Sequence, residues 1–435
     1  MKAFQKGLMT VLVSLALPMV AEAQTTARPI ALDEAVRLAR RNAPASVQAR
    51  NAVRQTSASV RSNWASFVPS LSFNTGATYS SGNTTNPNGQ IVPIANPWTY
   101  SRSLNGNLNL FDAGQRYFNL RASQANVDAA EAAEIAQDYT VALSVKQQYY
   151  AVLAAHEQTS AARKQLEQAE QQLRASTARV AAGAATRSDS LRSSIQVGNA
   201  RLAILTAQNG LATAEASLSR LIGSTEMVTA LVSDSGETGE IDISDEDLLR
   251  LAEEGPAVRQ ASAQVKATSQ AARAAKTPYL PTLNVSHAVS GNAASQEFQF
   301  SGQDFRQQPR TSFSVSFPIF NGLQREENVV RTRIAADNAN AQARDSRLNA
   351  RQQMVQQLGN FRTAQARVEI QIASVAAGEE DLRVQQERYN LGASTLLDLL
   401  TSQTTLDQAR TALIQARLDA RTAKAQIEAL IGRDL

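Results

Sequence analysis

Residues 179–183 read Arg-Val-Ala-Ala-Gly, and residues 388–392 read Arg-Tyr-Asn-Leu-Gly. An aspartate follows each glycine by six positions, at Asp189 and Asp398. The offset between the two stretches is 209 residues, and it recurs along much of the chain. It relates Phe111 to Phe320, Arg201 to Arg410, and Leu221-Ile222-Gly223 to Leu430-Ile431-Gly432. Ordered matches at one fixed offset indicate a tandem duplication.

Nearer the N-terminus the offset between the repeats is 212 residues. It relates Asp33-Glu34 to Asp245-Glu246, Pro44 to Pro256, and Phe67-Val68-Pro69 to Tyr279-Leu280-Pro281. The change of three residues predicts an irregular loop between Leu71 and Phe111. A period near 210 residues is too long for a solenoid repeat, so each half is expected to be a large substructure.

Long helices are predicted after the strand-like part of each repeat. The segment from Gln115 to about Val180 contains no Pro or Gly, and the segment from Gln324 to Leu391 contains no Pro and only two glycines, Gly359 and Gly378. At 1.5 Å per residue, each could reach about 100 Å. After the glycine turn a second helix returns, and its apolar residues keep a seven-residue step, which predicts a supercoiled seam. These residues are Val197, Ile204, Leu211 and Leu218, repeated as Leu406, Leu413, Ala420 and Ile427.

Two pairs of segments alternate apolar with polar residues, as strands with one apolar face do. Their polar positions are mainly Ser, Asn and Thr, which favours a barrel wall with lipid outside and water inside, although a soluble sheet is the alternative for these segments alone. Four strands cannot close a barrel, so at least two chains must share one. The strand segments are residues 71–79, 104–110, 283–290 and 312–317, joined by predicted loops at 81–99 and about 291–310.

Proline and glycine mark the junctions between helix and strand. Pro69 and Pro281 are predicted to end a helix and begin a strand, because the residue before proline avoids the helical region. Gly114 and Gly322 permit the sharp return from strand to helix, and Asp112 or Asn321 can cap the new helix.

Composition and the N-terminus restrict the class of protein. Aromatic residues make up 5% of the chain, and there is no cysteine. The net charge of +4 comes from 43 basic and 39 acidic residues that are interspersed, which argues against nucleic-acid binding. Lys2 and Lys6 precede an apolar run from Gly7 to Val20 and a small-x-small site at residues 21–23, which predicts a signal peptide. An uncleaved anchor is the alternative, but the run is short for a bilayer span.

The signal peptide, the duplicated helix–hairpin–helix units, the Pro-x-Leu junctions, the turn motifs and the terminal Leu-Ile-Gly resemble the TolC family of outer-membrane efflux proteins over the whole mature chain. The resemblance implies a mostly α fold with membrane β: a trimer in which four strands per chain form a shared twelve-stranded barrel in the outer membrane. A long helical barrel continues into the periplasm. The implied function is the exit duct of a tripartite efflux pump or a type I secretion system.

The resemblance also implies the partners: a periplasmic adaptor, an inner-membrane pump or ABC exporter, and outer-membrane lipid, with no nucleic acid and no cofactor. The expected organisation is a signal peptide at 1–23, a first repeat at 24–223 with its β-hairpin at 70–111, a linker at 224–245, and a second repeat at 246–435 with its β-hairpin at 282–320.

The same resemblance assigns roles to single residues. Arg179, Gly183, Arg388 and Gly392 match the helical tips that meet the adaptor. Asp398, Asp189 and Tyr389 match residues of the periplasmic entrance gate, where three copies of Asp398 would make an acidic ring favouring cations. The sequence departs from the best-known member at Ser394, where that protein has the gate arginine, and at Thr401, where it has a second entrance aspartate. Arg187 is a candidate substitute for the missing arginine.

Two other classes of protein fit the sequence less well. An enzyme would need convergent chemistry, but the only histidines, His156 and His287, fall in a long helix and a strand that the repeats do not pair, and no metal site is expected. A periplasmic coiled-coil adaptor is the alternative function. It would have one helical hairpin, whereas this chain has two, together with matching strand pairs.

Overall fold

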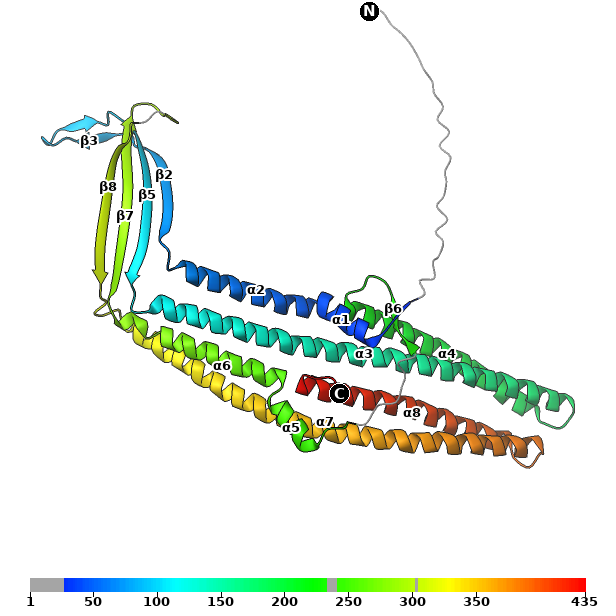
Figure 1. Cartoon of the computed structure of the whole chain (residues 1–435). Coiled ribbons are helices and arrows are strands. Elements are labelled where there is room, and N and C mark those ends of the chain that lie inside the picture. Colours follow the sequence, from blue (N-terminus) through cyan, green and yellow to red (C-terminus); the bar gives the residue numbers. More distant parts are fainter. Residues whose placement is uncertain (1–26, 233–240, 302–303) are drawn as a thin grey trace, which may run out of the picture.

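The computed structural model describes residues 27–232, 241–301 and 304–435. The molecule is elongated, with a curved sheet at one end and the tips of two helical hairpins at the other (Figure 1). The predicted signal peptide at 1–23 lies outside the described residues, as does part of the predicted linker at 224–245. Among the described helices, none combines the length and the apolar character needed to cross a membrane.

Two long helical hairpins form the bulk of the molecule. The first consists of α3 (Gln115–Ala181) and α4 (Arg187–Ile222), and the second of α7 (Gln324–Asn390) and α8 (Leu396–Ile431). Both long helices have 67 residues and both returning helices have 36, as a duplication requires. The predicted seven-residue seam is confirmed, because its members are buried or half-buried along both returning helices. The two hairpins also contact each other, through α3 and α8.

Shorter helices complete the wall between the middle of the molecule and the sheet. They are α1 (Leu32–Asn42) and α2 (Pro44–Ala65) in the first repeat, and α5 (Asp245–Glu253) and α6 (Pro256–Ala274) in the second. Pro44 and Pro256 each occupy the first helical position, where the missing amide hydrogen costs nothing. α2 lies along α3, and α6 lies along both α3 and α7 (Figure 1).

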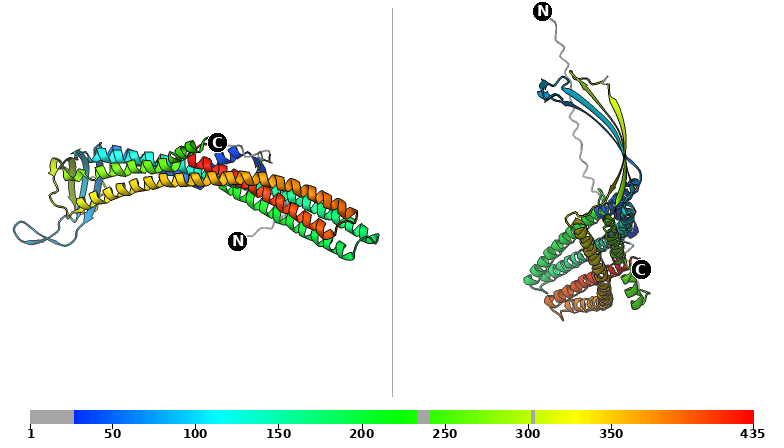
Figure 2. Two further views of the ribbon diagram at one scale, coloured as in Figure 1. Left: turned by 90° about the horizontal axis from the view of Figure 1, so that it is seen from below. Right: turned by 90° about the vertical axis from the view of Figure 1, so that its left-hand side faces the viewer.

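The sheet has four antiparallel strands in the order β2-β5-β7-β8. β5 and β7 form its centre, so the hairpins of the two repeats join edge to edge. β2 and β8 are the edges, each with one neighbouring strand in the described chain, and the sheet is curved (Figure 2). The strands are β2 (Ser70–Tyr79), β5 (Trp98–Phe111), β7 (Thr282–Ser295) and β8 (Arg306–Ser316).

The two loops between the strands are shorter in the structure than the sequence predicts. The segment at 81–99 contains a small hairpin of β3 (Asn83–Thr85) and β4 (Ile91–Pro93), closed by Asn86, whose side-chain oxygen accepts the amides of Asn88 and Gln90. The predicted loop at 291–310 shrinks because β7 and β8 extend into it from either side. Backbone pairing with a neighbouring strand stabilises these polar residues in extended form, which side-chain alternation alone does not predict.

The core lies in the middle of the molecule, where short segments from far apart in the sequence meet. β1 (Arg28–Ile30) pairs in parallel with β6 (Val228–Ala230), a contact that the sequence did not predict. Tyr149 of α3 is fully buried beneath this pair. Its hydroxyl donates to the carbonyl oxygen of Ile30 at 3.1 Å and accepts from the amide of Leu231 at 3.0 Å. Tyr149 thus joins both short strands to the long helix.

An ion-pair cluster ties the end of the second repeat to the first. Lys146 of α3 lies 2.6 Å from Glu428 of α8 and 2.6 Å from Asp434, and both Lys146 and Glu428 are largely buried. Burial acts to lower the pKa of Lys146, but the hydrogen bonds and charges of Asp434 and Glu428 outweigh it, so the pKa is raised. The lysine therefore stays charged at physiological pH and holds the C-terminal segment on α3.

We expect Tyr149→Phe to lower the free energy of unfolding by about 1–2 kcal/mol, because it removes two hydrogen bonds from a buried site. The thermal transition of the helical circular dichroism signal measures this change. Tyr117→Phe is the matched control, because Tyr117 is about half exposed and its loss should change stability by less than about 0.5 kcal/mol. Equal melting of the two variants would contradict a structural role for the Tyr149 hydroxyl.

Candidate functional site

The tips of the two helical hairpins have the same backbone geometry. Gly183 and Gly392 both adopt φ +74°, a left-handed conformation that glycine reaches without strain. In each tip an amide just after the glycine bonds back into the last helical turn, from Ala184 to the Arg179 carbonyl and from Ala393 to the Arg388 carbonyl, both at 2.8 Å. Neither glycine has a neighbour within 4 Å of a Cβ position, so both tips are open to a partner.

Asp189 and Asp398 lie in the first turns of the two returning helices and take part in their N-terminal caps. The Asp189 carboxylate accepts from the backbone amide and the hydroxyl of Thr186, at 3.0 and 2.8 Å. Asp398 does the same with Thr395, at 3.0 and 2.7 Å. Each threonine hydroxyl accepts from the aspartate amide in return, which completes a capping box. Both aspartates therefore have a local structural role, whether or not they also contact other residues at the entrance.

The carboxylate of Asp398 is held in its charged form by its hydrogen bonds. Hydrogen bonds from the Thr395 hydroxyl and backbone amide lower its pKa, with a further contribution from the Ser394 hydroxyl at 3.2 Å. The hydroxyl of Ser394 thus supports the carboxylate of Asp398 directly. Asp398 is exposed and ionised throughout the physiological pH range, which suits a charged entrance.

One contact joins the two hairpin tips within a chain. Nη1 of Arg179, in the first tip, donates to the carbonyl oxygen of Tyr389, in the second, at 2.6 Å. The Arg179 guanidinium also lies over the Tyr389 ring, with Cζ 4.5 Å from the ring centroid. Tyr389 is buried, and its hydroxyl has no hydrogen-bond partner among the described residues. The structure thus connects Tyr389 to Arg179, and joins it to Asp189 by no hydrogen bond in the described chain.

The remaining entrance residues make local contacts. Arg388 occupies the position in the second tip that Arg179 occupies in the first, but it donates only weakly to its own turn, to the Ala393 carbonyl at 3.5 Å. Thr401 is exposed and donates to the Leu397 carbonyl one turn earlier. Arg187 is exposed, and no side-chain hydrogen bond or ion pair engages it in the described part of the chain. Leu391, at the second tip, is 84% exposed, an apolar surface that the sequence analysis missed.

The junction residues lie where helices and strands meet. Pro69 and Pro281 immediately precede β2 and β7, although α2 and α6 end several residues earlier. Each return to a long helix uses two successive left-handed residues, Ala113 with Gly114 and Gly322 with Leu323. The glycine thus fills the second position in one repeat and the first in the other.

The two predicted caps of the long helices differ. Asp112 accepts from the amide of Arg116 at 3.1 Å and forms an ion pair with its side chain at 2.7 Å, so this cap is present. Asn321 does not cap α7: its side-chain oxygen is buried with no hydrogen-bond partner among the described residues. Leu323 takes the N-cap position of α7 in a left-handed conformation, as Gly114 does for α3, so the backbone turn is alike in both repeats and the difference lies in the side chains at 112 and 321.

The histidines lie in separate parts of the molecule. His156 contacts the hydroxyl of Thr229 at 2.7 Å beside the core, whereas His287 contacts the hydroxyl of Thr311 at 2.9 Å in the sheet. In the described ranges, no group of three or more His, Asp or Glu side chains could hold a metal ion.

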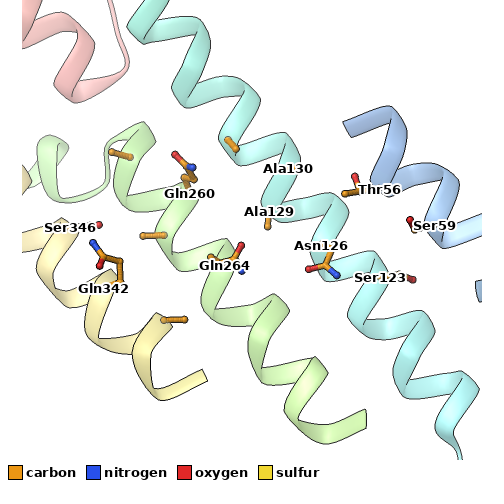
Figure 3. Close-up of a pocket in the computed structure, with 14 residues that line it drawn as sticks. Thr56, Ser59, Ser123, Asn126, Ala129, Ala130, Gln260, Gln264, Gln342 and Ser346 are labelled. Carbon is orange, nitrogen blue, oxygen red and sulfur yellow. The ribbon is translucent and has the colours of Figure 1, made fainter. Parts of the chain in front are cut away.

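A hollow of about 610 Å³ lies between α2, α3, α6 and α7 (Figure 3). Its lining consists of alanines and neutral polar residues, and it contains no charged side chain. Gln260, Gln264 and Gln342 extend into the space between α6, α7 and α3 (Figure 3). The lining has Ser and Thr hydroxyls but no titratable side chain that could activate them, so we interpret the hollow as space between the helices of the wall.

A family model described as "Outer membrane efflux protein" matches residues 35–224 and 249–433, which is most of both repeats. Protein CyaE of Bordetella pertussis is 25% identical over 382 residues, covering 86% of this chain and 78% of that protein.

Solved structures of outer-membrane channels share the fold. VceC of Vibrio cholerae superposes with a TM-score of 0.74 at 17% identity, covering 93% of this chain and 96% of that one. CusC superposes with a TM-score of 0.76 at 20% identity, covering 99% of both chains. The open state of the MtrE outer-membrane channel of Neisseria gonorrhoeae gives 0.73 at 18% identity, covering 92% of this chain and 89% of that one.

Proposed function

The chain belongs to the outer membrane efflux protein family, and from this membership we propose that three copies form one continuous duct from the periplasm to the cell exterior. It is an outer-membrane channel protein, and its helical part lies in the periplasm. The duct receives cargo from a periplasmic adaptor and an inner-membrane pump or ABC exporter, in an efflux pump or a type I secretion system.

The two open edges of the sheet are the observation that supports a barrel shared between copies, and the family supports the number three. β2 and β8 leave their outer backbone groups without a strand partner in the described chain. Such groups cost several kcal/mol each in lipid, so the edges must pair with other copies. Pairing β8 of one copy with β2 of the next closes a barrel, and three copies supply twelve strands. The long hairpins then line up below the barrel as a helical tunnel.

The hairpin tips are the proposed periplasmic entrance. Arg179, Gly183, Arg388 and Gly392 form the surface that meets the adaptor, and exposed Leu391 adds an apolar contact to it. Asp398, Asp189, Tyr389 and Thr401 form the gate, with Asp398 supplying an acidic ring when three copies meet. The segment at 224–245 contributes to a belt around the tunnel, since β6 within it packs into the core.

Fractionation and native mass test this function together. We expect the protein in the outer membrane, and we expect the detergent-extracted species to have three times the mass of the mature chain. Thr311→Pro, on edge strand β8, should weaken the trimer. Pro309 already pairs with β7 without an amide donor, so the amide of Thr311, two residues further on, faces the outer edge of the sheet, where proline removes it.

A soluble or inner-membrane species would contradict the shared barrel. A monomer in the outer membrane would contradict the trimer while leaving the family assignment intact.

A further inference from the structure

The two faces of the sheet differ in chemistry. Directly opposite residues in paired strands share a face, and so do alternate residues along one strand. Phe73 lies opposite Leu104, and Val285 lies opposite Phe313, so these aromatic and aliphatic side chains share one face. We call it the apolar face, and its other members include Leu71, Leu108, Leu283, Val289 and Val315.

The opposite side, which we call the polar face, consists mainly of serine and asparagine. Ser286 lies opposite both Asn107 and Ser312 on this face. In the proposed barrel the apolar face meets lipid, and the polar face therefore lines the lumen. Its uncharged members include Ser72, Asn74, Ser103, Asn105, Asn284, Ser290, Asn292 and Ser314.

Two positive charges interrupt the polar face. Arg310 lies opposite Ala288, and Arg306 lies opposite Asn292, so both belong to the lumen side of β8. They lie in the half of the strand far from the helices, because β8 runs from the outer end of the sheet towards α7 (Figure 1). They are four positions apart, about 13 Å along an extended strand.

No acidic residue balances these arginines. The four strands contain no Asp or Glu. The acidic residues that follow β7 and precede β8 are Glu297 and Asp304. In the part of the chain that the structure describes, neither forms an ion pair or a side-chain hydrogen bond with Arg306 or Arg310. The charge of both guanidinium groups is thus available to solutes.

A third arginine of the sheet has the other orientation. Arg102 of β5 lies opposite Thr75 and Gly291, and so belongs to the apolar face. Its Cζ lies 4.1 Å from the ring centroid of Phe305. Arg102 therefore carries the same charge in the same sheet, but on the side away from the lumen.

We propose that Arg306 and Arg310 form an anion-attracting zone in the outer half of the barrel lumen. This proposal rests on the proposed trimer, in which three copies place six guanidinium groups around one axis at two levels. Rings of arginine favour anions in pores, because each guanidinium offers several donors and keeps its charge at any physiological pH. At 0.1 M salt the field of each ring extends about 10 Å, which covers much of the space between the two levels.

The zone acts in series with the proposed acidic entrance. Asp398 lies at the hairpin tips and the two arginines lie in the sheet, at opposite ends of the molecule (Figure 1). Cations are favoured at one end and anions at the other. The net preference of the whole duct depends on both, whereas the change caused by removing the arginines depends on the outer zone alone.

The test measures ion selectivity in planar bilayers containing the purified full-length channel. Reversal potentials under a KCl gradient give the ratio of chloride to potassium permeability. We expect Arg306→Gln/Arg310→Gln to lower this ratio by at least about twofold, because the substitution removes the charge and keeps a polar side chain of similar length. Citrate, a trivalent anion at neutral pH, should block the unaltered channel more strongly than the variant.

Arg102→Gln is the matched control, because it removes one positive charge from the apolar face and should leave the ratio unchanged. An unchanged ratio in the Arg306→Gln/Arg310→Gln channel would overturn the proposal while leaving the channel function intact. An equal shift in Arg102→Gln would also overturn it, because the effect would then not depend on the lumen. Where the unaltered entrance stays closed, the same comparison is made in Arg179→Ala channels, whose tips should separate more easily. Failure of the protein to conduct ions in either background would contradict the proposed function itself.

Discussion

Gly255→Ala is expected to lower the free energy of unfolding by about 3 kcal/mol. Gly255 is the N-cap of α6, and a Cβ there would overlap the carbonyl oxygen of Leu430 in α8 and lie 3.0 Å from that of Ala252. Both atoms are backbone, so neither can rotate away as a side chain would. The φ angle of Gly255 is −66°, which any residue adopts, so the penalty is steric and not conformational. Thermal melting of the detergent-extracted protein and its yield in the outer membrane measure the loss.

Gly359→Ala provides the control for this substitution. Gly359 lies within α7, and no atom lies within 4 Å of its Cβ position. Alanine there should stabilise the helix by up to about 1 kcal/mol, because glycine is a poor helix former. The two glycine-to-alanine changes should therefore act in opposite directions. Melting of Gly255→Ala at the temperature of the unaltered protein would show that α6 and α8 pack less closely in solution than in the structure.

Gly255 also illustrates what the duplication could not predict. Its counterpart in the first repeat is Ala43, which already carries a Cβ and is buried. The glycines that end the two returning helices also have different neighbours. A Cβ on Gly223 would lie 2.9 Å from the Cβ of Asn42, whereas a Cβ on its counterpart Gly432 would lie 2.6 Å from Cγ of Pro256. Aligned repeats thus predict the same elements but not the same close contacts, because each copy has adjusted its packing separately.

The elements with strong backbone punctuation were predicted well. The two long helices, their glycine turns and the four strands were found because Pro is absent inside the long helices, Gly is absent from α3 and rare in α7, and both residues occur at the junctions. Every feature also appears twice. β1 and β6 were missed, since three residues show no period and the pairing joins segments about 200 positions apart. The hairpin of β3 and β4 was missed for a similar reason, because its residues are too polar and too few to show alternation.

At both hairpin tips the sequence contains the pattern of a helix capping box, which predicts local contacts of the two aspartates. Thr186 precedes Asp189 by three residues and Thr395 precedes Asp398 by three, the spacing of a capping box. That pattern predicts the local hydrogen bonds of both aspartates from sequence alone. The contact between Arg179 and Tyr389 could not be predicted in this way, because it joins two hairpins whose relative position depends on the whole fold.

The second large effect is expected at that contact, where Arg179→Ala should favour the open state of the entrance. Arg179 donates to the Tyr389 carbonyl and lies over its ring, so separation of the two tips must break both interactions. Together they contribute about 2 kcal/mol per chain, which corresponds to about a thirtyfold shift, in each chain, between joined and separated tips. Single-channel recordings without adaptor measure the open probability directly. Arg388→Ala is the matched control because the Arg388 side chain donates its hydrogen bond, and directs its charge, within the second tip, and in the described part of the chain it forms no hydrogen bond or ion pair with the first.

Tyr389→Phe distinguishes two ways in which Tyr389 could hold the entrance closed. One is its contact with Arg179, and the other is a gate contact made by its hydroxyl, as the family resemblance implies. The Tyr389 hydroxyl has no partner among the described residues, whereas its ring and its carbonyl oxygen both contact Arg179. Phenylalanine keeps the ring and the carbonyl, so the open probability of Tyr389→Phe should match that of the unaltered channel. Tyr389→Ala removes the ring but keeps the backbone carbonyl, so its open probability should lie between those of the unaltered channel and Arg179→Ala. If Tyr389→Phe opens the channel as strongly as Tyr389→Ala does, the hydroxyl must bind a partner such as Asp189 in the assembled trimer. In that case the Arg179 contact would not be what keeps the tips together.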